Sequence, residues 1–136
     1  MDLPLKSYLP EDYIEEVDMR LSVYQRITSL TTVEEVDDLE KELIDRFGPL
    51  PTEAENLLYV VRIKALGYRA GLESILTNVD VVTLRLFAGL QFNRQKLMSY
   101  YKYGIKIGTT QLIMGLKRAG KDWQKVLIDI LKTSAL

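Results

Sequence analysis

The chain has 136 residues, of which 47% are apolar and 27% charged, a composition typical of one globular domain. It contains no cysteine and no histidine, which excludes disulfides and thiolate chemistry and removes the commonest general base and metal ligand. No apolar run reaches the roughly 18 residues that a membrane span needs, and no signal peptide opens the chain, so we expect a cytoplasmic protein without membrane contact.

The net charge of −1 conceals an uneven distribution along the chain. Residues 1–56 carry 15 acidic and 5 basic side chains, a net charge of −10, whereas residues 57–136 carry 4 acidic and 13 basic side chains, a net charge of +9. Two surfaces with different partners would explain this asymmetry, and so would two halves that pack together and neutralise each other.

The first half predicts an extended lead-in and two helices. Residues 1–14 contain Pro4 and Pro10, each of which disfavours a helical conformation in the residue before it. We expect this lead-in to be attached to the domain by Tyr8, Leu9, Tyr13 and Ile14. A helix follows over 15–30, with a predicted buried stripe of Val17, Leu21, Tyr24 and Ile27.

The next helix, over 33–47, has two contrasting faces. Thr31 or Thr32 can cap it, because Glu34 or Glu35 follows at capping-box spacing. Its apolar residues recur every three or four positions: Val33, Val36, Leu39, Leu43 and Phe47. The opposite face is mostly acidic and comprises Glu34, Asp37, Asp38, Lys41, Glu42 and Asp45.

A stiff corner separates this helix from a third helix, predicted over 52–70. Gly48 can close the helix in a left-handed conformation, and Pro49 prevents its continuation. Pro51 presets the entry of the third helix, which Thr52 can cap with Glu55. Each corner residue therefore has a backbone or packing role and none requires a ligand: Phe47, Gly48, Pro49, Leu50 and Pro51.

The second half changes period and predicts the order β-β-α-β-β-α. Strands are expected over 73–76, 81–87, 105–107 and 111–117, with a helix over 93–103 and a last helix that Asp122 caps. We therefore predict an α+β fold in which a three-helix bundle precedes a small part with a mixed or antiparallel sheet. As one domain over 1–136, it divides into a lead-in (1–14), a helical part (15–71) and a mixed α/β part (72–136).

Catalytic and cofactor signatures are missing from the sequence. The adjacent carboxylates at 34–38 lie on a predicted solvent face, whereas a working acid or base needs burial or a close partner to tune its pKa. No calcium-loop, zinc-helix or phosphate-loop pattern occurs. We therefore expect no enzymatic activity, no metal and no cofactor in this chain.

A nucleic-acid-binding module is the alternative from another class. Tyr100, Tyr101 and Tyr103 lie among Lys102 and Lys106, and aromatic rings between cations can stack on single-stranded nucleic acid. At helical spacing the same rings also serve as core or core-edge residues. The other basic residues of this half are spread over many elements, so the sequence leaves this alternative open.

The first half resembles the C-terminal domain of bacterial transcription-repair coupling factors, the Mfd family. The resemblance rests on "YLPEDYIEEVDMRLSVYQRI" at 8–27, on "ELIDRFGPLP" at 42–51 and on "NLL" at 56–58. It covers most of residues 5–75 and extends more loosely to the second half. One departure is Glu15, where the family usually has proline.

The resemblance implies a regulatory role within a larger protein. The whole factor would be an ATP-driven translocase on double-stranded DNA that removes stalled RNA polymerase and recruits UvrA. Its C-terminal domain would pack on a UvrB-like module of the same polypeptide, cover the UvrA-binding surface and restrain translocation until polymerase is engaged. DNA would be contacted through other domains. Met1 would not begin the natural factor, and Leu136 would lie near its end.

Together with the acidic helix, the resemblance indicates a candidate docking surface. We expect four exposed carboxylates of the 33–47 helix to pair with arginine or lysine on the UvrB-like module: Glu35, Asp38, Glu42 and Asp45. Glu42 is the first candidate, because it lies where the family's acidic helix approaches the corner.

Overall fold

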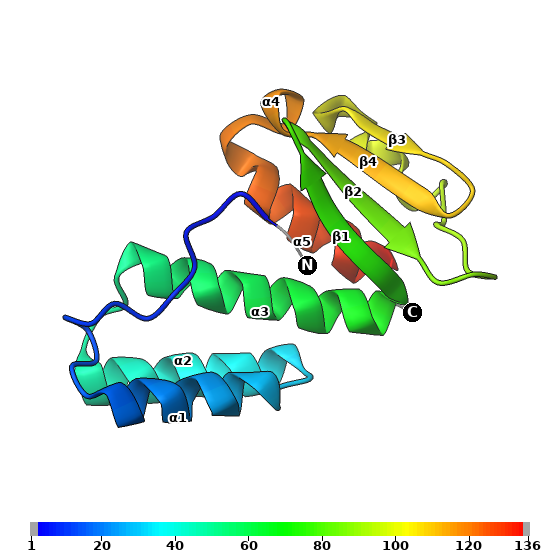
Figure 1. Ribbon diagram of the computed structural model, residues 1–136. Helices are drawn as coiled ribbons and strands as arrows, with labels where there is room; N and C mark the ends of the chain where they lie inside the picture. Colours follow the sequence, from blue (N-terminus) through cyan, green and yellow to red (C-terminus); the bar gives the residue numbers. More distant parts are fainter. Residues whose placement is uncertain (1–2, 135–136) are drawn as a thin grey trace. The chain divides into compact units, whose positions relative to one another are not determined.

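The computed structural model describes residues 3–134, and the α+β prediction is confirmed: helices come first and an antiparallel sheet with a further helix follows. The chain forms two compact units (Figure 1). The helical unit comprises residues 5–65, and the sheet unit comprises residues 66–134 together with Leu3 and Pro4. Each unit is described by itself.

The helical unit contains α1 (Val17–Thr28), α2 (Val33–Phe47) and the part of α3 (Thr52–Ala70) that ends at Ala65. The bounds predicted for α2 and α3 are confirmed. The centre of its core is fully buried and includes Val36 and Leu39 of α2 with Ala54 and Leu58 of α3. Since α2 supplies three buried residues at helical spacing, its apolar stripe orients the helix and turns its acidic face outward.

The lead-in is held against all three helices. The Leu9 N–H donates to the Tyr24 hydroxyl at 2.7 Å, and the Tyr8 N–H donates to the carbonyl of Glu53 at 3.3 Å. Leu9 and Ile14 are buried, whereas the side chain of Tyr8 is exposed. Of the residues expected to attach the lead-in, Tyr8 therefore does so through its backbone.

The predicted buried stripe of α1 is wrong for Val17 and Leu21, whereas Tyr24 and Ile27 do pack, partly buried, against the core. Val17 and Leu21 are 58% and 54% exposed, and Val23 is the buried residue of this helix. The helix also begins later than predicted, at Val17, with Glu16 as an N-cap that makes no side-chain capping bond. The reason is that Met19 and Val23, which recur at helical spacing with Ile27, pack against the core, so the buried face is rotated away from Val17 and Leu21.

The sheet unit is built on four antiparallel strands in the order β1-β2-β4-β3. They are β1 (Leu72–Asn78), β2 (Val81–Leu86), β3 (Ile105–Ile107) and β4 (Gln111–Gly115). Side chains alternate across the sheet, so Ile75, Val82, Leu84, Leu112 and Met114 are buried on one face. The buried residues of α5 (Trp123–Ser134) complete this core, and α5 lies along the sheet (Figure 1).

Among the described residues of the sheet unit, no helix covers the other face of the sheet (Figure 1). The pairing register places Ser74, Arg85 and Gln111 in one row, and Leu76, Thr83, Ile113 and Lys106 in the next. Arg85, Leu76 and Lys106 are exposed, and the remaining members are partly buried. On this open face, the paired residues of the two rows include two cations and no carboxylate, while the carboxylate of Glu73 lies at the bulge before Ser74.

Two predicted elements of the sheet unit are wrong in kind or extent. The predicted helix over 93–103 is a turn followed by a 3-10 helix, η1 (Met98–Tyr103), although Asn93 does cap the turn by accepting from the Lys96 N–H at 3.0 Å. The strand predicted over 111–117 ends at Gly115, because the chain turns into a helix at Leu116, whose N–H makes a last bond in the β2–β4 register, to the Asp80 carbonyl at 2.7 Å. A short helix, α4 (Leu116–Ala119), and the 3-10 turn η2 (Gly120–Asp122) then lead to α5.

Candidate functional site

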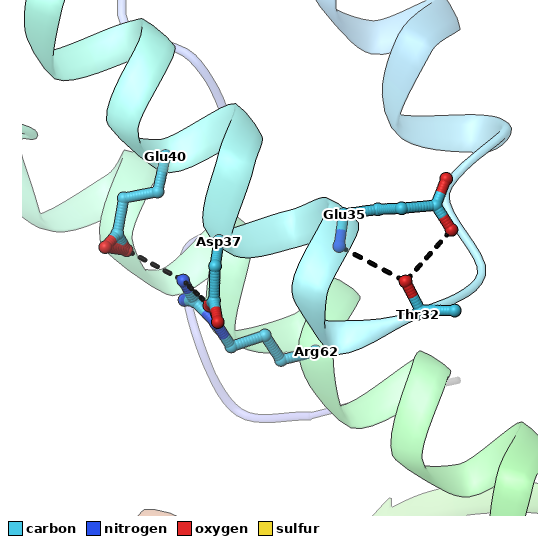
Figure 2. Close-up of polar contacts among 5 residues, drawn as sticks. All are labelled: Thr32, Glu35, Asp37, Glu40 and Arg62. Atoms are coloured by element: carbon cyan, nitrogen blue, oxygen red, sulfur yellow. Dashed lines mark hydrogen bonds and ion pairs between the residues drawn. The ribbon is translucent and has the colours of Figure 1, made fainter.

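The start of α2 shows what one of the four predicted docking carboxylates does within the unit. The Glu35 N–H donates to the Thr32 Oγ1 at 3.2 Å, and this hydroxyl donates to a Glu35 carboxylate oxygen at 3.0 Å (Figure 2). The hydrogen bonds from Thr32, and then from Thr31, hold the pKa of Glu35 below its usual value. Glu35 is thus a capping residue, and Thr32 is the N-cap.

On one side, α2 pairs with α3 through an arginine that the sequence analysis did not single out for this role. Arg62 donates to Asp37 at 2.9 and 3.1 Å and to Glu40 at 2.9 Å (Figure 2). The Arg62 side chain is 21% exposed, so part of this network is shielded from water. Two carboxylates of the acidic helix are therefore neutralised inside the unit.

On its other side, α2 pairs with α1. Arg26 forms an ion pair with Glu42, and both side chains are about two-fifths exposed. Glu42, the first candidate for docking, thus already has an intramolecular partner. An exposed pair of this kind contributes about 0–1 kcal/mol and can exchange partners at small cost.

A line of exposed residues runs along α2 between its α1 side and its α3 side. We call this line the outward ridge, and it is formed by Glu34, Asp38, Lys41 and Asp45. Their spacing of four, three and four places them on one face of α2, and all four are exposed. Within residues 3–134, none of the four makes an ion pair or a side-chain hydrogen bond. The ridge therefore joins Asp38 and Asp45, while Glu35 and Glu42, two helical turns apart, lie together on its α1 side with partners of their own.

The corner after α2 is rigid and apolar. Gly48 has φ 92° and ψ −172°, a positive-φ conformation that is more extended than the predicted left-handed one. The Tyr13 hydroxyl donates to the carbonyls of Gly48 at 2.8 Å and Leu43 at 3.2 Å, and the Tyr13 and Phe47 rings meet edge to face at 5.9 Å. Thr52 is the first residue of α3 and not its cap, since the Pro51 carbonyl accepts the first bonds of that helix.

A hollow of about 330 Å³ opens beside this corner. Its apolar lining comes from Tyr13, Ile14, Met19 and Phe47, and its carboxylates come from Asp12, Glu15 and Glu16. The Arg46 guanidinium lies 5.2 Å from the centre of the Phe47 ring and donates to the Met19 sulfur at 3.7 Å. The lead-in, α1 and the corner thus create a second acidic surface in the helical unit, which the sequence did not reveal because Phe47 joins the residues at 12–19 only in the folded unit.

Two features of residues 3–134 bear on metals and membranes. No group of three or more Asp, Glu, His or Cys residues in this range is placed to hold a metal ion. No helix within it is long and apolar enough to cross a membrane.

Known proteins resemble this chain in sequence and in structure. Residues 3–97 match the family model of the TRCF domain. The chain is 32% identical to the transcription-repair-coupling factor of Bacillus subtilis over 97% of its own length, and 40% identical to that of Escherichia coli over 55% of its length. It spans only 12% and 6% of these two proteins, respectively.

The fold has a match among solved structures. The crystal structure of the C-terminal domain of a transcription-repair coupling factor superimposes with a TM-score of 0.80, over 97% of this chain and 88% of that one, at 21% identity. The helices, the four-stranded sheet and the family model agree with the resemblance seen in the sequence. The chain belongs to the TRCF domain family, the C-terminal domain of transcription-repair coupling factors.

Proposed function

We propose that this chain is a non-catalytic regulatory domain of a cytoplasmic transcription-repair coupling factor. It docks on the UvrB-like module of the same polypeptide, masks the surface that binds UvrA and restrains the DNA translocase until RNA polymerase is engaged. The outward ridge of α2 carries this proposal, because it presents carboxylates that have no partner among the described residues, whereas the other carboxylates of this helix are paired or hydrogen-bonded within the unit.

The ridge suits a contact that must form and release. Glu34, Asp38 and Asp45 are the unpaired anions on it, and Glu42 lies beside them with an exposed partner, Arg26, that a cation of the docking module can displace. Each exposed pair contributes about 0–1 kcal/mol, so several together hold the module while none alone prevents its release. The buried stripe of α2 fixes the direction in which these carboxylates point.

The test uses the full-length factor that contains this domain. Charge reversal of Asp38 and Glu42 to lysine should raise both basal ATPase activity and UvrA binding in the absence of polymerase, because the cations of the docked module would then face like charges. Asp45→Lys should add to the effect. The matched control is Glu55→Lys, an exposed acidic position on α3 outside the ridge, which should leave both readouts unchanged.

Two results would contradict the proposal. If the Asp38 and Glu42 reversals leave ATPase activity and UvrA binding at the control level, α2 has no part in restraint. If Glu55→Lys raises them equally, the effect comes from net charge and not from the ridge. Thermal unfolding of each variant shows whether the domain remains folded.

A further inference from the structure

The middle of the sheet unit contains no acidic residue. Between Val81 and Lys121 there are 8 basic side chains and no aspartate or glutamate. All eight are exposed: Arg85, Arg94, Lys96, Lys102, Lys106, Lys117, Arg118 and Lys121. Of these, Lys117 alone makes an ion pair with another described residue, Asp80. This acid-free segment, which includes β2, β3 and β4, is therefore a concentrated and largely uncompensated source of positive potential.

A polar hollow lies at one end of the sheet, where the β3–β4 turn meets the loop after β2. It has a volume of about 240 Å³ and is lined by Gln91, Phe92, Arg94, Gly108 and Thr109. The guanidinium, the amide and the hydroxyl in this set are donors suited to phosphate oxygens, and no carboxylate is among them. The turn is fixed, because the Gly108 N–H donates to the Gln111 carbonyl at 2.7 Å and the Leu86 N–H donates to the Thr110 carbonyl at 2.8 Å.

A second arginine continues the donors of this hollow onto the open face of the sheet. Arg85 donates to the Gln111 side-chain oxygen at 3.4 Å, and the Gln111 side chain lies against Gly108, which lines the hollow. Arg85 and Arg94 therefore belong to one continuous donor surface at the turn end of the sheet. Lys106 extends it along β3, two strands from Arg85.

We propose that this surface binds the phosphate backbone of a nucleic acid, with a phosphate group in the hollow between Arg94 and Thr109 and a neighbouring one at Arg85. The hollow alone would be enough to bind an isolated phosphate. The positive surface extends beyond it to Arg85 and Lys106, and such a row of cations suits a chain of phosphates. No aromatic ring occupies the two rows of the open face, and Tyr100 packs against Tyr103, so the contact is to the backbone and not to stacked bases.

The binding experiment measures fluorescence anisotropy of a labelled duplex of 20 base pairs, and of one of its strands, with the chain at 25 to 200 mM potassium chloride. The test variant is Arg85→Ala with Arg94→Ala. The control variant is Lys125→Ala with Lys132→Ala, which removes two exposed cations from α5 of the same unit. All four positions are exposed, so both variants should fold, and circular dichroism checks this.

We expect salt-dependent binding of the duplex that the test variant weakens at least about tenfold at the lowest salt, since charged hydrogen bonds are lost. The slope of log affinity against log salt should fall by about two, one for each lost phosphate contact. The control should change affinity less than about threefold. Inorganic phosphate at equal ionic strength should shift the Gly108 and Thr109 amide resonances only weakly.

Four outcomes would overturn this proposal. The first is no binding of either nucleic acid at 25 mM salt, and the second is an equal loss in the test and control variants. The third is saturable binding of inorganic phosphate at the hollow without binding of the nucleic acids. The fourth is binding of polyglutamate of equal charge as tightly as the duplex, with the same sensitivity to Arg85 and Arg94, which would make the ligand an acidic protein.

Discussion

The helical unit and the sheet unit differ in how they use charge. Residues 5–65 carry 14 acidic and 7 basic side chains, and residues 66–136 carry 4 acidic and 11 basic ones, so their net charges are −7 and +7. In the helical unit, two arginines and the N-cap engage four acidic residues of α2. In the described part of the sheet unit, Lys117 and Asp80 form the one ion pair.

The comparison shows that equal net charges do not offer equal surfaces to a partner. The α2 helix is flanked by α1 and α3, and each of them supplies an arginine that pairs with carboxylates of α2. Only a narrow ridge of unpaired charges therefore remains on its acidic face. The acid-free segment of the sheet unit has almost no carboxylate to pair with, so its cations remain available. The charges that remain after local pairing therefore determine the surface offered to a partner. The two units differ in how much of their charge is paired, and this difference leads to the following predictions.

The largest effects should come from the two cores. Leu39→Ala in the helical unit and Leu112→Ala in the sheet unit each remove a fully buried side chain and should lower the free energy of unfolding by about 2–5 kcal/mol. Hydrogen exchange should show the larger loss of protection in the unit that carries the substitution. Equal losses in both units would mean that they unfold as one, and the charge comparison would then lack a structural basis.

Breaking the shielded ion pairs should have the next largest effect. Arg62→Ala removes the partner of Asp37 and Glu40 and should lower the free energy of unfolding by about 1–2 kcal/mol, because two partly buried carboxylates lose charged hydrogen bonds. Arg26→Ala at the exposed pair with Glu42 should cost less than about 1 kcal/mol. Urea denaturation measures the loss in free energy of unfolding for each variant. A larger loss for Arg26→Ala than for Arg62→Ala would contradict the stronger pairing between α2 and α3.

The N-cap of α2 links stability to pH. Thr32→Ala should lower the free energy of unfolding by about 1 kcal/mol, the usual cost of losing a cap. It should also let the pKa of Glu35 rise toward 4.5, since the Thr32 hydroxyl is the main cause of its lowering. Carbon-detected NMR titration of the Glu35 carboxyl measures this rise.

The sign of the pH effect follows from that lowered pKa. The folded-state pKa of Glu35 lies below its value in the unfolded chain, so its ionised form stabilises the folded state at pH values above the unfolded pKa. This contribution disappears as the pH falls through the folded-state pKa. The Thr32→Ala variant should accordingly lose less stability on acidification than the parent, and an unchanged acid dependence would show that the cap does not control this carboxyl.

The smallest effects should come from the outward ridge. Asp38→Asn and Asp45→Asn remove charges that have no partner among the described residues, so the free energy of unfolding should change by less than about 0.5 kcal/mol. Thermal denaturation measures this change. A loss above 1 kcal/mol would mean that these carboxylates stabilise the unit itself, and the ridge would no longer be a surface reserved for a partner.

Local signals in the sequence predicted much of the fold. The Thr32 cap, Pro49 and Pro51 bound α2 and α3, and their predicted limits are confirmed. The choice between Leu21 and Val23 as the buried residue of α1 depended on how the helices face one another, which one sequence does not state. The segment at 93–103 has a helical cap but ends in a 3-10 helix, because the packing of buried Leu97 overrides a weak local preference.

The candidate surfaces were harder to predict for the same reason. The acidic face of α2 was evident from its spacing, but its pairing with Arg62, which is 22 and 25 positions away from its two partners, requires the third dimension. The polar hollow joins Gln91 and Arg94 to a turn at 108–109 that is adjacent only after the sheet has formed. Composition indicated which half carries excess charge, and the fold determines which side chains present it.

The three attachments of the lead-in have a mechanical consequence. Tyr8 is bonded to α3, Leu9 to α1 through Tyr24, and Tyr13 to the end of α2. A pull on the polypeptide ahead of Leu5 is therefore shared among three helices and does not peel one of them away. Tension on the lead-in would therefore displace the helical unit as a rigid body and move its acidic ridge without distorting it.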